Sequence, residues 1–101
     1  MGSRNGQARL RLWQRGFRHC FYCLVPLVMT RGAQCANTAT VDHILPRSEG
    51  GTTHPGNTVM ACYICNGMRG IMTVDEFRAY LQTDHGKERR ARLALALRSS
   101  R

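Results

Sequence analysis

Residues 41–70 read VDHILPRSEGGTTHPGNTVMACYICNGMRG, and this stretch carries the most informative secondary-structure signals of the chain. Its β-branched residues make residues 38–45 the predicted first strand of a hairpin and residues 58–61 the returning strand. Between them, residues 46–57 contain prolines and glycines that exclude regular structure, and loops of that length in a compact domain are usually functional. Residues 62–70 predict a cysteine turn that runs into a short helix, so the stretch indicates an α+β domain.

Two cysteine pairs of equal spacing frame this stretch. Cys20 and Cys23 precede it, and Cys62 and Cys65 lie near its end. Each CxxC turn can present two thiolates to one tetrahedral ion, which predicts a structural zinc site. A redox role is the alternative, but a redox CxxC usually occurs once and beside a βαβ pattern, which this sequence does not show. Cys35 has no partner of matching spacing, and we assign it no role beyond a free thiol.

Four polar residues inside the frame carry groups suited to phosphodiester hydrolysis. Asp42 offers a hard oxygen ligand to a divalent cation, and His43 offers a base that titrates near neutral pH. Asn66 can place an amide oxygen on the same ion if helix and hairpin pack face to face, and Asn57 can hydrogen-bond across the loop. Each residue also has a plainer interpretation, because Asp-His pairs are common and asparagines often occupy turns or cap helices.

The position of Asp42 and His43 on a strand sets a condition on this hypothesis. Adjacent residues of an extended strand point to opposite faces of the sheet. The two side chains can therefore serve one site only if the strand ends or twists at this point, which the following Ile44-Leu45-Pro46 permits.

The chain is strongly basic, which predicts a polyanionic partner. Its 101 residues include 15 Lys plus Arg against 6 Asp plus Glu, for a formal net charge of +9, and all but one of the cations are arginines. Arginine forms forked hydrogen bonds to phosphate, so nucleic acid is favoured over a merely soluble basic surface or attraction to anionic lipid. The cations gather toward the two ends of the chain, which predicts phosphate contacts on the flanks and chemistry in the centre.

The flanks are predicted to be helical. Residues 7–18 fit an amphipathic helix with Leu10, Trp13 and Phe17 on its apolar face. Thr73 followed by Glu76 forms a capping box that begins a helix over residues 74–82. Beyond Gly86, residues 87–98 contain good helix formers, and they are either a solvated tail or a dimer contact. The predicted organisation is a basic arm (residues 1–19), a core (residues 20–70) and a C-terminal extension (residues 71–101).

Membrane and secretory classes are not expected. The longest apolar run, residues 20–29, is well short of the roughly 20 residues that a membrane-spanning helix needs. The first 19 residues carry arginines and no continuous apolar stretch, unlike a secretory signal. We therefore expect a cytoplasmic location, where thiols stay reduced and bind metal rather than form disulfides.

The segment from Cys20 to Gly70, about half of the chain, resembles the HNH endonuclease family. The family pattern is CxxC, a hydrophobic-Asp-His-Ile-x-Pro segment, Gly-Gly, Asn, and CxxCN followed by a basic residue and glycine. The matching elements of this chain are Cys20/Cys23, residues 41–46, Gly50-Gly51, Asn57, Cys62/Cys65/Asn66 and Arg69-Gly70.

The resemblance implies a small ββα-metal (His-Me finger) domain. It implies that His43 activates water, that Asp42 and Asn66 bind the catalytic divalent ion, and that Asn57 braces the loop. An asparagine at position 66, where other members have a third histidine, is similar to phage junction-resolving and mobile-element nucleases, which leaves a phage-encoded source open. The oxygen ligands fit Mg²⁺ or Mn²⁺ better than a catalytic zinc.

We therefore expect an endonuclease that hydrolyses DNA and nicks one strand at a time. The alternative is a catalytically inactive, zinc-stabilised DNA-binding or phage packaging accessory module. A homodimer or a larger DNA-processing complex is left open. Arg69 stands where the family usually has lysine and is expected to contact phosphate. The candidate DNA-binding residues are Arg11, Arg15, Arg18, Arg47 and Arg69.

Overall fold

The structure is a computed structural model that describes residues 4–30, 32 and 34–99. It is a small mixed α/β domain with a single β-hairpin among the described residues. Two short 3₁₀ helices, Arg47–Glu49 and Pro55–Asn57, interrupt the loop between the strands. The other elements are helix α1 (Arg4–Gln14), strand β1 (Ala39–His43), strand β2 (Thr58–Cys62), helix α2 (Tyr63–Arg69), helix α3 (Val74–Leu81) and helix α4 (Asp84–Ser99).

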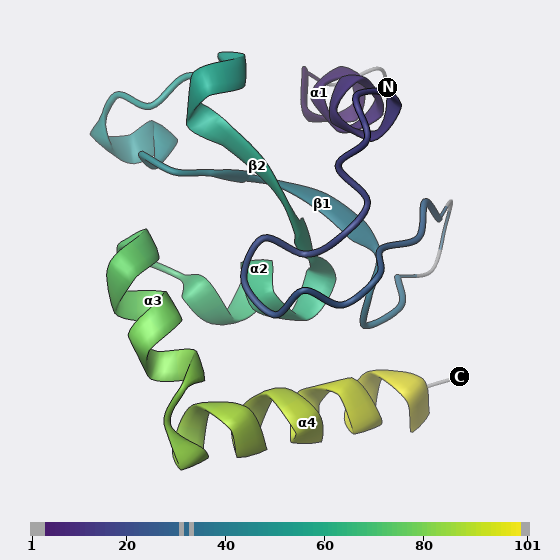
Figure 1. Cartoon of the computed structure of the whole chain (residues 1–101), viewed down its shortest axis with the longest axis vertical. Helices are drawn as coiled ribbons and strands as arrows, with labels where there is room; N and C mark the ends of the chain where they lie inside the picture. The colour runs from purple at the N-terminus through teal and green to yellow at the C-terminus, as the bar shows by residue number, and fades with distance from the viewer. Residues whose placement is uncertain (1–3, 31, 33, 100–101) are drawn as a thin grey trace.

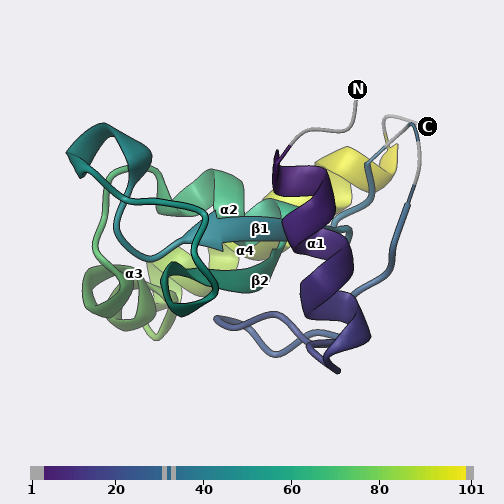
Figure 2. The same cartoon turned by 90° about the horizontal axis from the view of Figure 1, so that it is seen from above.

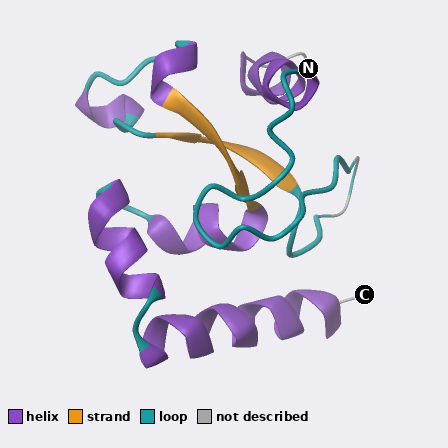
Figure 3. Cartoon of the chain, viewed as in Figure 1, coloured by secondary structure: helices purple, strands orange, loops and turns teal. Residues whose placement is uncertain are grey.

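The hairpin lies between helices. Strands β1 and β2 are antiparallel, with His43 opposite Thr58 and Ala39 opposite Cys62. Helix α1 covers one side of the hairpin and α2 the other, while α3 and α4 lie beyond α2 (Figures 1 and 2). Figure 3 shows that long loops join α1 to β1 and β1 to β2. The predicted strands and the short helix after the second cysteine turn are thus confirmed, within one or two residues at their ends.

The core joins the first cysteine turn to the C-terminal helices. Phe77 of α3 and Met60 of β2 are the largest fully buried side chains. The rings of Tyr22 and Phe77 meet edge to face with their centroids 4.9 Å apart. The predicted capping box is present, because Thr73 accepts a hydrogen bond from the Glu76 backbone and Glu76 accepts one from the Thr73 backbone. Helix α3 therefore starts at the predicted residue and buries its apolar side against Tyr22.

Helix α1 differs from the predicted amphipathic helix. It ends at Gln14 rather than residue 18, because Gly16 takes φ +97° and the N–H groups of Gly16 and Phe17 turn back to the carbonyls of Trp13 and Leu12. Its buried residues are Ala8 and Leu12. Two of the three side chains predicted to form the apolar face are about half exposed, Leu10 (49%) and Phe17 (47%). The predicted helix is therefore confirmed, but its end was wrong because the prediction continued the helix through a glycine that ends it, and its apolar face was wrong as well.

Helix α4 begins before Gly86, not after it as predicted. The Thr83 hydroxyl accepts a hydrogen bond from the Gly86 N–H at 3.0 Å and caps the first turn. A Cβ atom at Gly86 would lie 2.1 Å from the Tyr80 carbonyl oxygen, so only glycine fits this close approach of α4 to the end of α3. Within the described ranges, no helix is long and apolar enough to cross a membrane.

Candidate metal centre and catalytic site

Four cysteines from two distant parts of the chain meet in one cluster. The sulfur atoms of Cys20, Cys23, Cys62 and Cys65 all lie within 4.8 Å of one another, and none of the four forms a disulfide. Backbone N–H groups of each turn point at its first sulfur: Cys20 Sγ accepts from Tyr22 and Cys23, and Cys62 Sγ accepts from Cys65. Such bonds favour the thiolate form. Hydrogen bonds from Cys23, Cys62 and Cys65 hold the pKa of Cys20 far below its ordinary value.

The geometry of the cluster fits zinc. A tetrahedral Zn²⁺ with Zn–S bonds of about 2.3 Å places its sulfurs about 3.8 Å apart. The Sγ atoms of Cys23 and Cys62, one from each turn, are 3.8 Å apart. The cluster is thus placed to hold a metal ion, and its four sulfur ligands suit a closed structural site.

Arg90 of α4 reaches this cluster from outside. Its Nη2 donates to Cys62 Sγ at 3.6 Å. Burial alone would lower the pKa of Arg90, but hydrogen bonds to Cys62 and Cys65 raise it above its ordinary value. Its Nε is the one buried side-chain N or O atom without a hydrogen-bond partner in the described part of the chain. Arg90 is therefore a half-buried cation placed against the cysteines.

Asp42 lies at the centre of a buried polar network. Its Oδ2 accepts hydrogen bonds from the Tyr22 hydroxyl and from Arg69 Nη1, the latter at 2.8 Å. Burial raises the pKa of Tyr22, and the adjacent carboxylate raises it further, so the hydroxyl keeps its proton and donates a hydrogen bond to Asp42. Among the hydrogen bonds of the described residues, none reaches Oδ1 of Asp42. One oxygen of the carboxylate is thus fixed and the other is left for a further partner.

Arg69 is a structural residue in this fold, not a surface contact. It is only 3% exposed, and its guanidinium donates to the carbonyls of His43, Ile44 and Met72 as well as to Asp42. These bonds tie the end of α2 to the end of β1. The expectation that Arg69 contacts phosphate is corrected accordingly, because its donors are used inside the protein. No sequence pattern indicated this burial, since a basic residue before a glycine is equally typical of a surface contact.

His43 is the last residue of β1 and is half-buried. Its Nε2 lies 3.2 Å from the Thr53 hydroxyl, so a loop residue orients the imidazole. Asp42 and His43 leave the strand on opposite faces, as alternation requires. The strand ends at His43, as the sequence permitted, and that the two side chains serve one site stays a prediction.

Asn57 holds the loop after His43 in shape. Its amide oxygen accepts from the Leu45 N–H at 2.8 Å, and its amide nitrogen donates to the carbonyls of Leu45 and Thr52. The Gly-Gly pair serves the same loop: a Cβ at Gly51 would lie 1.7 Å from the Leu45 carbonyl oxygen, so no other residue fits there. These contacts fix the segment that carries Thr53 and so fix the partner of His43.

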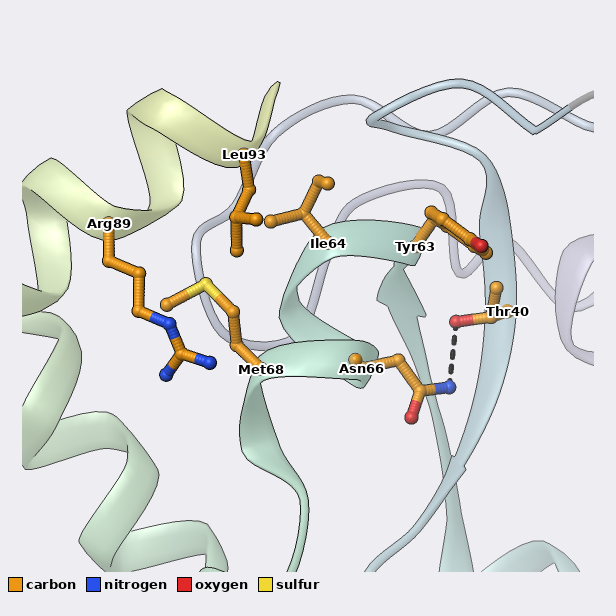
Figure 4. A pocket seen from close by; sticks show the side chains of 8 residues that line it. Thr40, Tyr63, Ile64, Asn66, Met68, Arg89 and Leu93 are labelled. Atoms are coloured by element: carbon orange, nitrogen blue, oxygen red, sulfur yellow. Dashed lines mark hydrogen bonds between the residues drawn. The ribbon is translucent and has the colours of Figure 1, made fainter. Parts of the chain in front are cut away.

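Asn66 projects from α2 toward β1. Its amide nitrogen donates to the Thr40 hydroxyl at 3.0 Å and to the Val41 carbonyl at 3.2 Å. Figure 4 shows the amide nitrogen directed at Thr40 and the amide oxygen turned away from it. Helix and hairpin therefore pack face to face, as required for Asn66 to share a site with Asp42.

The remaining candidate arginines occupy different places. Arg11 and Arg15 line a hollow that also contains Thr53, the partner of His43. Arg18 instead lies over the ring of Trp13, with its guanidinium carbon 4.2 Å from the ring centroid, and donates to the Trp13 carbonyl. Arg47 is exposed in the first 3₁₀ helix of the loop. The structure thus brings two of the five candidate arginines close to the residue that orients His43.

Three residues of this region were not found from the sequence. Tyr22 and Thr53 hold Asp42 and His43, and Arg90 contacts the cysteine cluster. In the sequence, Tyr22 is one of the two variable positions of the first CxxC turn, and Thr53 is a loop residue, so neither position indicated a role. Arg90 comes from a helix whose packing the sequence left open. Each acts through tertiary contact, which no local pattern encodes.

Comparison with known proteins identifies the family. Residues 20–70, which include both cysteine turns, the hairpin and α2, match the HNH endonuclease family. No curated protein and no solved structure was found to match the chain. The matched segment spans half of the chain and carries the cysteine frame together with Asp42, His43, Asn57 and Asn66. The chain therefore belongs to the HNH endonuclease family.

Proposed function

We propose that this protein is a metal-dependent endonuclease that hydrolyses DNA phosphodiester bonds, with His43 as the general base. The observation that carries the proposal is the packing of α2 on β1. Asn66 and Arg69, neighbours on one face of α2, both bond to the strand that carries Asp42 and His43. Family membership supports the nuclease class, and this packing supports the choice of residues that we propose for the site.

Asp42 and Asn66 are the residues that would hold a catalytic Mg²⁺ or Mn²⁺. A carboxylate and an amide oxygen form a hard ligand set, and Oδ1 of Asp42 is the oxygen that Arg69 and Tyr22 leave unused. When bound, such an ion draws negative charge from the phosphate and stabilises the leaving oxygen. Arg69 neutralises part of the charge on Asp42, so we expect the protein alone to bind the ion weakly. The substrate phosphate would then complete the ligand set of the ion.

His43 would take the proton from the attacking water. Nε2 is bonded to the Thr53 hydroxyl, and we propose the tautomer in which Nε2 donates this bond and Nδ1 accepts the proton. The water oxygen then bonds to phosphorus, the P–O bond opposite it breaks, the leaving oxygen takes a proton from solvent water, and His43 returns its proton to solvent. One strand end carries a phosphate and the other a hydroxyl. Arg11 and Arg15, beside Thr53, are placed to bind phosphates near this point.

The test is cleavage of supercoiled plasmid by the purified protein with a series of divalent ions. The proposal predicts conversion to the nicked form with Mg²⁺ or Mn²⁺, and loss of this conversion in the His43→Ala variant. A protein that binds DNA but leaves the plasmid intact under every ion would instead be an accessory module. Zinc content and circular dichroism of both proteins confirm that the comparison is between folded molecules.

A further inference from the structure

Two hollows open side by side along β1 and α2, and Asn66 lines both. One, of about 520 Å³, lies between α2 and α4 and is bordered by Arg89 and Leu93 (Figure 4). The other, of about 380 Å³, lies toward α1 and is bordered by Arg9. Thr40, Tyr63 and Asn66 line both, so the two hollows adjoin, and together they are called the Asn66 groove below. The volume of each hollow is in the range of about 300–1,000 Å³ typical of ligand sites.

The charge of the Asn66 groove favours an anionic occupant. Arg89 stands toward one end and Arg9 toward the other, and neither hollow has an aspartate or glutamate among its lining residues. Arg9 is held beside the strand by a hydrogen bond from Nη1 to the Ala39 carbonyl at 3.2 Å. An apolar occupant would cover these arginines without pairing their charge, which is unfavourable. Phosphates spaced along a strand would pair with both.

Tyr63 adds an aromatic surface next to Asn66. It is the first residue of α2 and is 41% exposed. In Figure 4 its ring and the amide of Asn66 both lie beside Thr40. Exposed aromatic rings in basic grooves stack on the bases of single-stranded nucleic acid. The two arginines alone could bind any polyanion. An aromatic ring between them favours nucleic acid, because nucleic acid also carries bases that can stack on the ring.

We infer that the Asn66 groove binds one strand of DNA, with phosphates at Arg9 and Arg89 and a base stacked on Tyr63. This inference rests on the proposed function, because it makes the groove the route by which a phosphodiester reaches Asn66. It also gives α4 a role, since α4 supplies the wall that carries Arg89. The strand must have an unpaired base at Tyr63, so the groove recognises single-stranded or locally opened DNA.

The test is equilibrium binding of a fluorescently labelled single-stranded oligonucleotide of about 12 nucleotides, measured by anisotropy at several salt concentrations without added divalent ion. Arg89→Ala should weaken binding roughly fivefold or more. It should also reduce the slope of log K against log salt concentration, called the salt slope below, by about the amount expected for one lost phosphate contact. Tyr63→Ala should weaken binding by a similar or larger factor without changing that slope, and Tyr63→Phe should restore it. The matched control is Arg92→Ala, because Arg92 is an exposed arginine of α4 that pairs with Glu88 and lies outside the groove lining.

Two results would overturn the inference. One is that Tyr63→Ala and Arg89→Ala bind the oligonucleotide as tightly as the wild type and the Arg92→Ala control do. The other is a concentration-dependent dimer that dissociates in the Tyr63→Ala variant while DNA binding stays unchanged, which would show that the groove holds a second copy of the chain. The binding assay does not depend on cleavage. Full nicking by His43→Ala would therefore refute the proposed function without contradicting DNA binding in the Asn66 groove. Thermal melting of each variant excludes loss of the fold.

Discussion

At the scale of single residues, Asp42 is the most constrained group of the site. The Tyr22 hydroxyl and Arg69 both bond to its Oδ2, and the Tyr22 ring packs on Phe77. Tyr22→Phe removes the hydroxyl and keeps the ring, so the fold and the zinc content should be retained. A hydrogen bond to a charged group contributes about 1.5–3 kcal/mol, and the freed carboxylate should bind the catalytic ion less well. We expect nicking to need roughly tenfold more Mg²⁺.

The measurement is the initial nicking rate as a function of Mg²⁺ concentration. A purely structural role for Tyr22 would lower the melting temperature and leave the Mg²⁺ dependence unchanged. That pattern would contradict a role of the hydroxyl in positioning Asp42 for the ion. A shifted Mg²⁺ requirement would support it, including when loss of the hydrogen bond also lowers the melting temperature.

Arg69 gives a prediction about stability. Removing one partner of a buried ion pair leaves a buried charge without compensation and costs about 3–5 kcal/mol. Arg69→Ala also removes donors to three backbone carbonyls, so the free energy of unfolding should fall by at least that amount. Urea denaturation monitored by circular dichroism measures the change. Arg92→Ala, at an exposed site, should stay within about 0.5 kcal/mol of the wild type, and a similar small effect at position 69 would refute the structural role.

At the scale of elements, α4 brings Arg90 to the cysteine cluster. Four thiolates and one Zn²⁺ leave two net negative charges, and Arg90 places a cation against Cys62. Groups that hydrogen-bond to metal ligands commonly change metal affinity by about 10–100-fold. Arg90→Gln keeps the polarity and much of the length but removes the charge, and we expect it to release zinc at least tenfold faster.

Zinc release is followed with a chromogenic chelator, with Arg92→Ala as the exposed control on the same helix. Equal release rates for the two variants would show that Arg90 does not support the centre. Because this assay requires no DNA and no catalytic ion, its result is independent of the nuclease proposal.

The elements show where sequence patterns were sufficient. The hairpin and α2 were predictable because β-branched residues, turn residues and the two cysteine turns act locally. Helix α3 was predictable because Thr73 and Glu76 cap it within a few residues. Helix α1 was misplaced because Gly16 ends it through backbone geometry, and α4 because Gly86 is needed for a contact with Tyr80. Glycine thus marks an end in one helix and a packing contact in the other.

At the scale of the whole molecule, the cysteine cluster joins segments that are far apart in the sequence. Cys20 and Cys23 come from the loop after α1, and Cys62 and Cys65 from the junction of β2 and α2. A domain of this size buries little apolar surface, so metal binding contributes directly to folding. Removal of zinc by a strong chelator should lower the melting temperature markedly and reduce helical content. Circular dichroism before and after restoration of zinc measures this, and unchanged melting of the zinc-free protein would contradict it.

Some features of the candidate site could be predicted from the sequence, and others are known only from the fold. The types and order of Asp42, His43, Asn57 and Asn66 were readable, because their chemistry and their place between the cysteine turns are sequence properties. The partners were not readable, because Tyr22, Thr53 and Arg69 reach the site from other segments. The burial of Arg69 reversed its expected role, since only packing decides whether a basic residue meets phosphate or a carboxylate.

The central claim is that His43 is the general base of a nuclease, and the rate of plasmid nicking by His43→Ala tests it most directly. Loss of a general base costs about 10²–10⁴-fold in rate. The control is His85→Ala, because His85 is an exposed histidine of α4 far from β1 in the chain. We expect His43→Ala to lose at least about a hundredfold in Mg²⁺-dependent nicking while its zinc content and melting temperature match the wild type. Full activity in His43→Ala, with or without loss in His85→Ala, would contradict the claim.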